Sequence, residues 1–168
     1  MQVPDSTRKL FVLRHGKAEA YNQLGDRARD LAPRGRSDAQ KMGKLIASLT
    51  ISLDLVISSD AARASQTAAI AGAAAGYCGE IAYRADLYAA SVNAIAKTIS
   101  SVPSSAKSLL MVGHNPGLEE FCEEIGRLKA PFIVLPTCGL AGFEIAGDWH
   151  DFRSSEIRFL GLWQPKTL

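Results

Sequence analysis

Arg14, His15 and Gly16 follow directly on the apolar run Leu10–Leu13, and they are the residues best suited to chemistry at one place. The run predicts a buried strand, so the three residues are expected at the carboxyl edge of a sheet, where open α/β folds bind their ligands. A guanidinium binds phosphoryl oxygens through two N–H groups, and an imidazole nitrogen can attack phosphorus. The glycine permits a sharp turn or the close approach of a ligand. This segment alone suggests a phosphate site, although a histidine after a strand more often serves packing.

Two further strand ends carry polar groups of the same kind. Ser58 and Ser59 end one apolar run, and the helix predicted after them presents Arg63 in its first turn. Another run ends in Gly113, His114 and Asn115. Because the carboxyl ends of parallel strands lie on one edge of a sheet, two arginines and two histidines are expected to meet there.

The elements that must position these residues alternate between strand and helix. Apolar runs predict strands over 10–13, 54–58, 81–83, 108–112, 140–146 and 156–163, and helical spacing predicts helices over 35–49, 60–75, 91–101 and 118–125. Asp60 and Ser91 are candidate N-caps. The pattern predicts an α/β fold, a three-layer α/β/α sandwich whose mostly parallel sheet has an antiparallel C-terminal addition. It forms one domain over 1–168, with residues 1–8 as a flexible N-terminal tail.

Composition excludes several functional classes. The chain has 168 residues, of which 47% are hydrophobic, and 19 basic against 17 acidic residues give a net charge of +2, too small to indicate nucleic acid binding. Neither a membrane-spanning run nor a signal peptide is found, so no membrane partner is expected. Cys78, Cys122 and Cys138 are odd in number and widely spaced, which favours buried free thiols in a reducing cytoplasm over disulfides or zinc.

Four segments together resemble the histidine phosphatase superfamily, and most of all the small SixA-type phosphohistidine phosphatases. Besides Arg14-His15-Gly16, they are Arg29-Asp30-Leu31-Ala32-Pro33-Arg34-Gly35, Ser58-Ser59-Asp60-Ala61-Ala62-Arg63-Ala64-Ser65-Gln66-Thr67 and Val112-Gly113-His114-Asn115-Pro116-Gly117. The ending Gln164-Pro165-Lys166-Thr167-Leu168 is also similar. Asp60 stands where the family has proline, and Ala32 where it has threonine. The resemblance covers nearly the whole chain and implies a phosphoglycerate mutase-like fold.

The resemblance also implies a role for each residue. His15 would be the nucleophile and carry a transient phosphoryl group, for which its ring must be neutral. Arg14, Arg63 and His114 would bind the three non-bridging oxygens and neutralise their charge. These side chains would do the work of a metal ion, so neither a metal nor another cofactor is expected.

The general acid is less clearly marked. Asp86, between the third strand and the next helix, is the nearest candidate by position. Glu19 is the other, and it is more typical of a residue that orients its neighbours. A solvated carboxylate is the alternative interpretation for each. The arginines Arg27, Arg29, Arg34 and Arg36 are interpreted as a solvated loop, with a weaker option of steering an acidic partner.

The short segment between Ala75 and Lys107 leaves no room for a large cap, so an open, shallow site is expected. Such a site can admit a phosphorylated protein, and phosphohistidine on a protein is the preferred substrate. A small phosphate ester, with the chain acting as a metabolite phosphomonoesterase, is the first alternative. A phosphate-binding module without catalysis is the second. The oligomeric state is left open.

Overall fold

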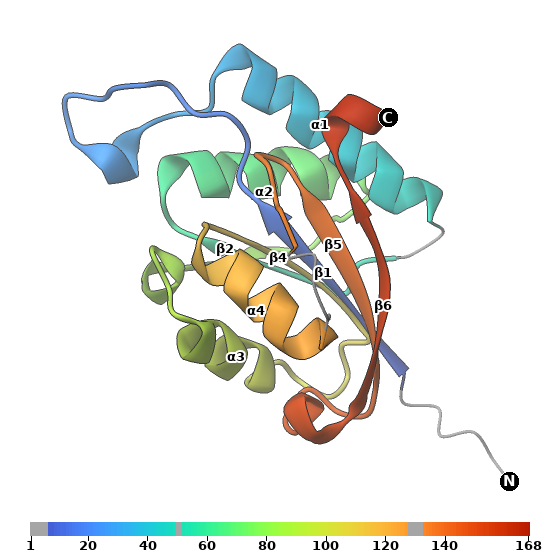
Figure 1. Ribbon diagram of the computed structural model, residues 1–168. Coiled ribbons are helices and arrows are strands. Elements are labelled where there is room, and N and C mark those ends of the chain that lie inside the picture. The colour runs from blue at the N-terminus through green and yellow to red at the C-terminus, as the bar shows by residue number, and fades with distance from the viewer. Residues whose placement is uncertain (1–6, 50–51, 128–132) are drawn as a thin grey trace, which may run out of the picture.

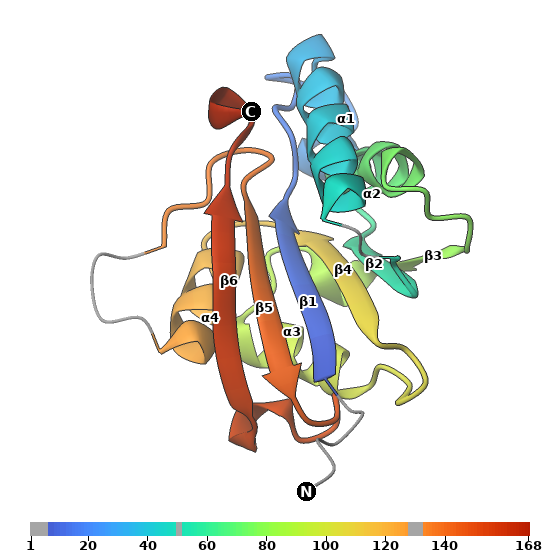
Figure 2. The ribbon, with the colours of Figure 1, turned by 90° about the vertical axis from the view of Figure 1, so that its right-hand side faces the viewer.

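Six strands form one sheet in the computed structural model, which describes residues 7–49, 52–127 and 133–168. The order across the sheet is β3-β2-β4-β1-β5-β6 (Figure 2). The strands are β1 (Thr7–Arg14), β2 (Leu55–Ser59), β3 (Ile81–Arg84), β4 (Ser108–Gly113), β5 (Leu140–Ala146) and β6 (Glu156–Trp163). The strands β3, β2, β4 and β1 are parallel, whereas β5 is antiparallel to both of its neighbours, β1 and β6, which confirms the expected antiparallel C-terminal addition.

Helices cover both faces of this sheet. The helices α1 (Pro33–Ser48) and α2 (Ala62–Ala74) lie on one face, and α3 (Val92–Ser100) and α4 (Gly117–Gly126) lie on the other (Figure 1). Four short 3-10 helices lie in the connections: η1 (Asp26–Ala28), η2 (Ala85–Leu87), η3 (Phe152–Ser154) and η4 (Pro165–Thr167). The architecture is the three-layer sandwich that the sequence predicts.

Strand β1 is buried on both faces. Leu10 and Val12 pack with α3 and α4, while Phe11 and Leu13 pack with α1 and α2, and all four side chains have zero exposure. A strand between two helical layers needs apolar residues on both sides, which explains a run without polar alternation. The central position of β1 places Arg14 and His15 in the middle of the carboxyl edge.

Strand register brings the three polar strand ends to the same level. Arg14 pairs with Gly113 across β1 and β4, and Ser58 pairs with Val112 across β2 and β4. His15 and His114 therefore directly follow the ends of two neighbouring strands, β1 and β4, at the same level of the sheet. The Ser91 N-cap is confirmed, since its side chain accepts a hydrogen bond from the Ala94 backbone N–H.

The start of α2 and the start of β1 differ from what the sequence predicts. Helix α2 begins at Ala62 with Ala61 as its N-cap, and the Asp60 carboxylate instead accepts hydrogen bonds from Arg27. The aspartate thus binds a guanidinium on a neighbouring loop rather than the helix terminus. Strand β1 begins at Thr7, so Thr7 and Arg8 belong to the strand and not to the tail expected over residues 1–8, of which residues 1–6 lie outside the described residues.

The cysteines differ in part from expectation. Cys122 and Cys138 are buried free thiols, but Cys78 is exposed, because it follows the end of α2 in a surface connection. Across residues 7–49, 52–127 and 133–168, no helix has both the length and the apolar character needed to cross a bilayer.

Candidate active site

Three of the four expected residues line one hollow of about 180 Å³ at the carboxyl edge of the sheet. His15, Arg63 and His114 share it with Asp26, Tyr88, Ala89 and Asn115. The two histidine rings lie 5.0 Å apart between centroids. The convergence predicted from three separate strand ends is therefore present, and it brings a carboxylate and a phenol with it.

His15 is held in a form suited to nucleophilic attack. Its Nδ1 lies 2.9 Å from the backbone oxygen of Gly16. Burial lowers the pKa of His15 to about 4. The hydrogen bond to Gly16 acts in the opposite direction and raises the pKa, whereas the positive charges of Arg63 and Arg14 lower it further. The ring is therefore neutral at pH 7. When Nδ1–H donates to the Gly16 oxygen, Nε2 keeps its lone pair.

His114 is buried and is also neutral. Its Nε2 lies 2.8 Å from Oγ of Ser59, the last residue of β2. Burial first, and then the charge of a protonated His15, lower the pKa of His114 to about 3. Oγ of Ser59 also accepts from the Ala61 backbone N–H, so its own proton is available for Nε2. That arrangement leaves Nδ1–H of His114 as a donor.

Arg63 lies between His15 and Asp26. Its Nε is 3.4 Å from Nε2 of His15. Its Nη1 donates to the backbone oxygen of Asp26 at 2.8 Å, and its Nη2 binds Oδ2 of the same residue at 3.0 Å. The guanidinium is only 6% exposed. A buried cation needs such a partner, and the pairing also fixes which nitrogen faces the histidine.

Asp26 is a site residue that the sequence did not reveal. It lies in η1, within a charge-dense loop, and nothing in its neighbourhood distinguished it from Asp30. Tyr88 donates a hydrogen bond to Oδ2 of Asp26 at 2.6 Å, and Arg29 binds Oδ1 at 2.9 Å. The hydrogen bonds from Tyr88, Arg63 and Arg29 hold the pKa of Asp26 well below its usual range. The carboxylate is therefore ionised and does not serve as a proton donor at neutral pH.

Arg14 is not among the residues that line the hollow. Its Nη1 donates to the backbone oxygen of Leu135 at 2.9 Å. Its Nε is buried and has no partner among the described residues. The positive charge of Arg14 contributes to the lowered pKa of both histidines, which shows that it acts on the same site.

Gly16 is required for close packing against Gly35. A Cβ at position 16 would lie 2.9 Å from the backbone oxygen of Gly35, at the start of α1. From the other side, the backbone N–H of Cys138 donates to the carbonyl oxygens of both Arg14 and His15 at 3.1 Å. Cys138 adopts a left-handed φ of 57° to make this contact. The segment that carries His15 is thus packed against both Gly35 and Cys138.

The two carboxylates considered as general acids are not brought into the hollow. Asp86 forms an ion pair with Arg84 at 2.6 Å, which lowers the pKa of the carboxyl, and its side chain is 56% exposed. Glu19 is exposed, and its backbone N–H bonds the oxygen of Asp30. Of the four arginines expected on a solvated loop, Arg34 and Arg36 lie in α1 instead. Three of the four are ion-paired, with Arg27 to Asp60, Arg29 to Asp26 and Arg34 to Asp38. No group of three or more His, Cys, Asp or Glu residues in the described ranges could hold a metal ion.

Comparisons with known proteins agree with this geometry. Residues 10–115 match the model of the histidine phosphatase superfamily (branch 1). The uncharacterized protein Rv1276c of Mycobacterium tuberculosis is 28% identical over 162 residues, which covers 92% of this chain and 100% of the relative.

Solved structures extend the similarity over the full fold. A candidate SixA phosphohistidine phosphatase from Nakamurella multipartitia has a TM-score of 0.82 at 26% identity, covering 96% of this chain and 98% of the other. A second, from Agrobacterium tumefaciens, has a TM-score of 0.76 at 26% identity, covering 94% and 98%. The protein histidine phosphatase SixA in complex with tungstate shares the fold, with a TM-score of 0.82 at 19% identity and coverage of 95% and 98%. The chain thus belongs to the histidine phosphatase superfamily (branch 1), and its SixA-type neighbours support a phosphatase.

Proposed function

We propose that the chain hydrolyses phosphohistidine on a protein, through a phosphoryl group carried transiently by His15. The observation that carries the proposal is the state of this ring. It is neutral, its Nδ1 is engaged with the Gly16 oxygen, and its Nε2 faces Arg63 in a hollow at the sheet edge. A neutral imidazole with a free nitrogen beside a cation is arranged to accept a phosphoryl group.

In the first step, Nε2 of His15 forms a bond to phosphorus as the bond between phosphorus and the substrate nitrogen breaks. The electron pair of the broken bond stays on the departing nitrogen. The departing imidazole is neutral when its other ring nitrogen carries a proton, so this leaving group needs no acid from the enzyme. Asp86 is ion-paired and Asp26 is ionised, so neither is available as a proton donor. A phosphohistidine substrate, whose leaving group needs no such donor, suits this site.

Donors on side chains would stabilise the charge on the phosphoryl oxygens. The Arg63 cation and the neutral His114 line the hollow, and the buried Nε of Arg14, which has no partner among the described residues, is a further donor. Preorganised donors of this kind typically contribute about 10²- to 10³-fold each to a rate. In this proposal the cations take the part that a metal ion has in other phosphoryl transfers.

In the second step, water attacks phosphorus and the bond to Nε2 of His15 breaks. The electron pair returns to Nε2, which restores the neutral ring. Inorganic phosphate leaves with both protons of the water and then equilibrates with solvent. The enzyme ends the cycle in its starting protonation state.

The open mouth supports a protein substrate. Only η2 and the nine-residue helix α3 lie between β3 and β4, so this connection adds no large cap to the hollow. A phosphohistidine on a folded domain projects only a short distance from its backbone, so it needs a shallow site. The SixA neighbours are named as phosphohistidine phosphatases, which supports the choice of a phosphohistidine substrate. We place the reaction in the cytoplasm.

A side-by-side assay tests this function. Turnover of a phosphohistidine-carrying protein and of a panel of phosphate esters would be measured with wild type, His15→Ala and His150→Ala, the last as a control because His150 is exposed. We expect the phosphoprotein to be turned over in preference to the esters. The phosphoryl label on the enzyme should be acid-labile and base-stable. His15→Ala should abolish both turnover and labelling, whereas His150→Ala should abolish neither. Undiminished turnover by His15→Ala would refute the nucleophile. Preference for small esters would replace the protein substrate by a metabolite.

A further inference from the structure

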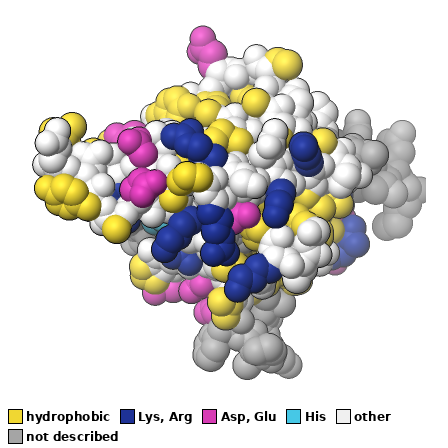
Figure 3. All heavy atoms as spheres, turned by 90° about the horizontal axis from the view of Figure 1, so that it is seen from above, with side chains coloured by type: hydrophobic (Ala, Val, Ile, Leu, Met, Phe, Trp, Pro, Cys, Tyr) yellow, Lys and Arg dark blue, Asp and Glu magenta, His cyan; other side chains and the backbone are white. Residues whose placement is uncertain are grey.

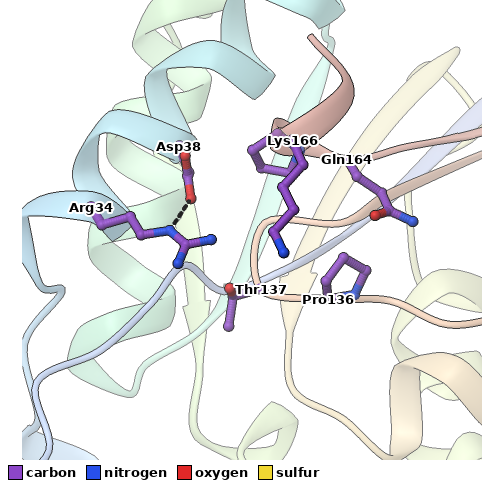
Figure 4. A pocket seen from close by; sticks show the side chains of 7 residues that line it. Arg34, Asp38, Pro136, Thr137, Gln164 and Lys166 are labelled. Atoms are coloured by element: carbon purple, nitrogen blue, oxygen red, sulfur yellow. Dashed lines mark ion pairs between the residues drawn. The ribbon is translucent and has the colours of Figure 1, made fainter.

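A second hollow, of about 80 Å³, lies between the start of α1, the segment before β5 and the C-terminal helix η4. Arg34, Asp38, Thr137 and Lys166 are among its lining residues (Figure 4). The proposed reaction uses none of them. Lys and Arg side chains gather on the face of the molecule that carries the carboxyl ends of the parallel strands (Figure 3).

Arg34 is oriented by a buried carboxylate. Nε of Arg34 lies 3.5 Å from Oδ2 of Asp38, one helical turn along α1, and the Asp38 side chain is only 8% exposed. The terminal nitrogens of the guanidinium point into the hollow (Figure 4). A guanidinium held through Nε keeps its two terminal N–H groups for an oxyanion, which is the fork geometry that binds carboxylate or phosphate.

Lys166 reaches the same space from the opposite side. Its side chain extends from η4 toward the Arg34 guanidinium, above Thr137 (Figure 4). No ion pair with another described residue engages Lys166, and the Thr137 hydroxyl makes no hydrogen bond within the described ranges. Two cations and one carboxylate leave the hollow with a net charge of +1. Two cationic donors and a hydroxyl around one space suit a carboxylate or phosphate oxyanion.

This hollow borders the nucleophile segment. Thr137 directly precedes Cys138, whose backbone N–H binds the carbonyl oxygens of Arg14 and His15. Arg34 directly precedes Gly35, which contacts Gly16. A protein surface that presents phosphohistidine to His15 therefore also lies near Arg34 and Lys166.

We infer that this hollow binds an acidic side chain of the phosphoprotein substrate, through Arg34, Lys166 and Thr137. The inference rests on the proposed function and adds a specificity site to it. Binding there would select phosphohistidines with a carboxylate at one distance and direction, and would orient the substrate before phosphoryl transfer. The same oxyanion chemistry could belong to a small ester with a second anionic group, so the experiment needs an arm for each source.

The test uses peptides that contain a phosphonate analogue of phosphohistidine, so that binding is measured without turnover. One series carries a single glutamate at successive positions on either side of the analogue, and the matched series carries glutamine. A second arm compares alkyl phosphates that end in a carboxylate with those that end in a hydroxyl. Dissociation constants are measured by calorimetry for wild type, Arg34→Gln, Lys166→Gln and the control Lys41→Gln, which removes the same charge from an exposed position of α1.

We expect one glutamate position to bind about tenfold more tightly than its glutamine counterpart, as for one charge-assisted contact. This gain should persist in Lys41→Gln and fall below twofold in Arg34→Gln and Lys166→Gln. Equal binding of both series to wild type, or a gain that survives in both pocket variants, overturns the inference. A gain confined to the alkyl phosphates overturns the assignment to a protein. Turnover of para-nitrophenyl phosphate, followed in parallel, reports separately on the proposed phosphatase reaction.

Discussion

Nη2 of Arg63 lies 3.0 Å from Oδ2 of Asp26, so the arginine beside His15 is held by a carboxylate from a loop far from it in the sequence. The same guanidinium places its Nε 3.4 Å from Nε2 of His15. The orientation of Arg63 toward His15 thus depends on Asp26, and through Asp26 on the hydrogen bond from Tyr88.

Substitution of Asp26 tests this dependence. Without the carboxylate the guanidinium loses its charged partner and can rotate away from His15, so kcat should fall, by about tenfold in Asp26→Asn and further in Asp26→Ala. Steady-state kinetics on para-nitrophenyl phosphate measure the effect. Asp60→Asn is the matched control, because Asp60 is an exposed carboxylate that also binds an arginine. Wild-type kcat in Asp26→Ala would exclude the positioning role.

The carboxylates expected to act as acids should matter little. Asp86 is engaged with Arg84 and Glu19 is exposed, and neither lines the hollow of His15. We expect Asp86→Asn and Glu19→Gln to change kcat by less than about threefold, even on alkyl phosphates whose leaving group needs a proton. A loss of 10²-fold or more in either variant, confined to esters with poor leaving groups, would identify that residue as the acid after all.

The two active-site histidines should titrate far below an ordinary histidine. Side-chain NMR of the ligand-free protein should give a pKa of about 4 for His15 and about 3 for His114. Their unfolded counterparts take up protons near pH 6.5, whereas the folded rings do not until about pH 4. Proton uptake therefore favours unfolding as the pH falls between these values.

The free energy of unfolding should therefore decrease as the pH falls below 6.5. Each histidine lowers the free energy of unfolding by at most about 1.4 kcal/mol per pH unit as the pH drops below 6.5. Denaturant unfolding of wild type and His15→Asn from pH 7 to pH 4.5 would show it. The variant should have the shallower slope, and equal slopes would mean that the pKa of His15 is not lowered.

Gly35→Ala should destabilise the protein and its site together. A Cβ there would lie 2.2 Å from the backbone oxygen of Lys17, so the chain beyond Gly16 must move. We expect a loss of about 1–3 kcal/mol in the free energy of unfolding, measured by denaturant titration, together with reduced activity. Gly72→Ala is the control. Its Cβ would meet nothing nearer than 3.8 Å, and a helical alanine is favoured over glycine by up to about 1 kcal/mol.

The sequence predicts the framework of this site because the framework rests on local patterns. The buried run Leu10–Leu13 and the run before His114 predict parallel strands, and parallel strands bring His15, Arg63 and His114 to one edge. Asp26 could not be found in this way, since its role comes from the folding of an irregular loop over α2. Tyr88 likewise acquires its role from a contact 62 residues away in the chain. Asp60 was misassigned as a cap because its partner Arg27 lies on that same loop.

The hydrogen bonds from Cys138 to the carbonyls of Arg14 and His15 have an evolutionary consequence. They attach the nucleophile to the segment before β5, on the side of the sheet away from β3. Tyr88 and Ala89, which border the opening, belong instead to the connection after β3. Descendants of such a fold could exchange that connection for a longer one and acquire new substrates, while the segment that carries His15 keeps its attachment to Cys138.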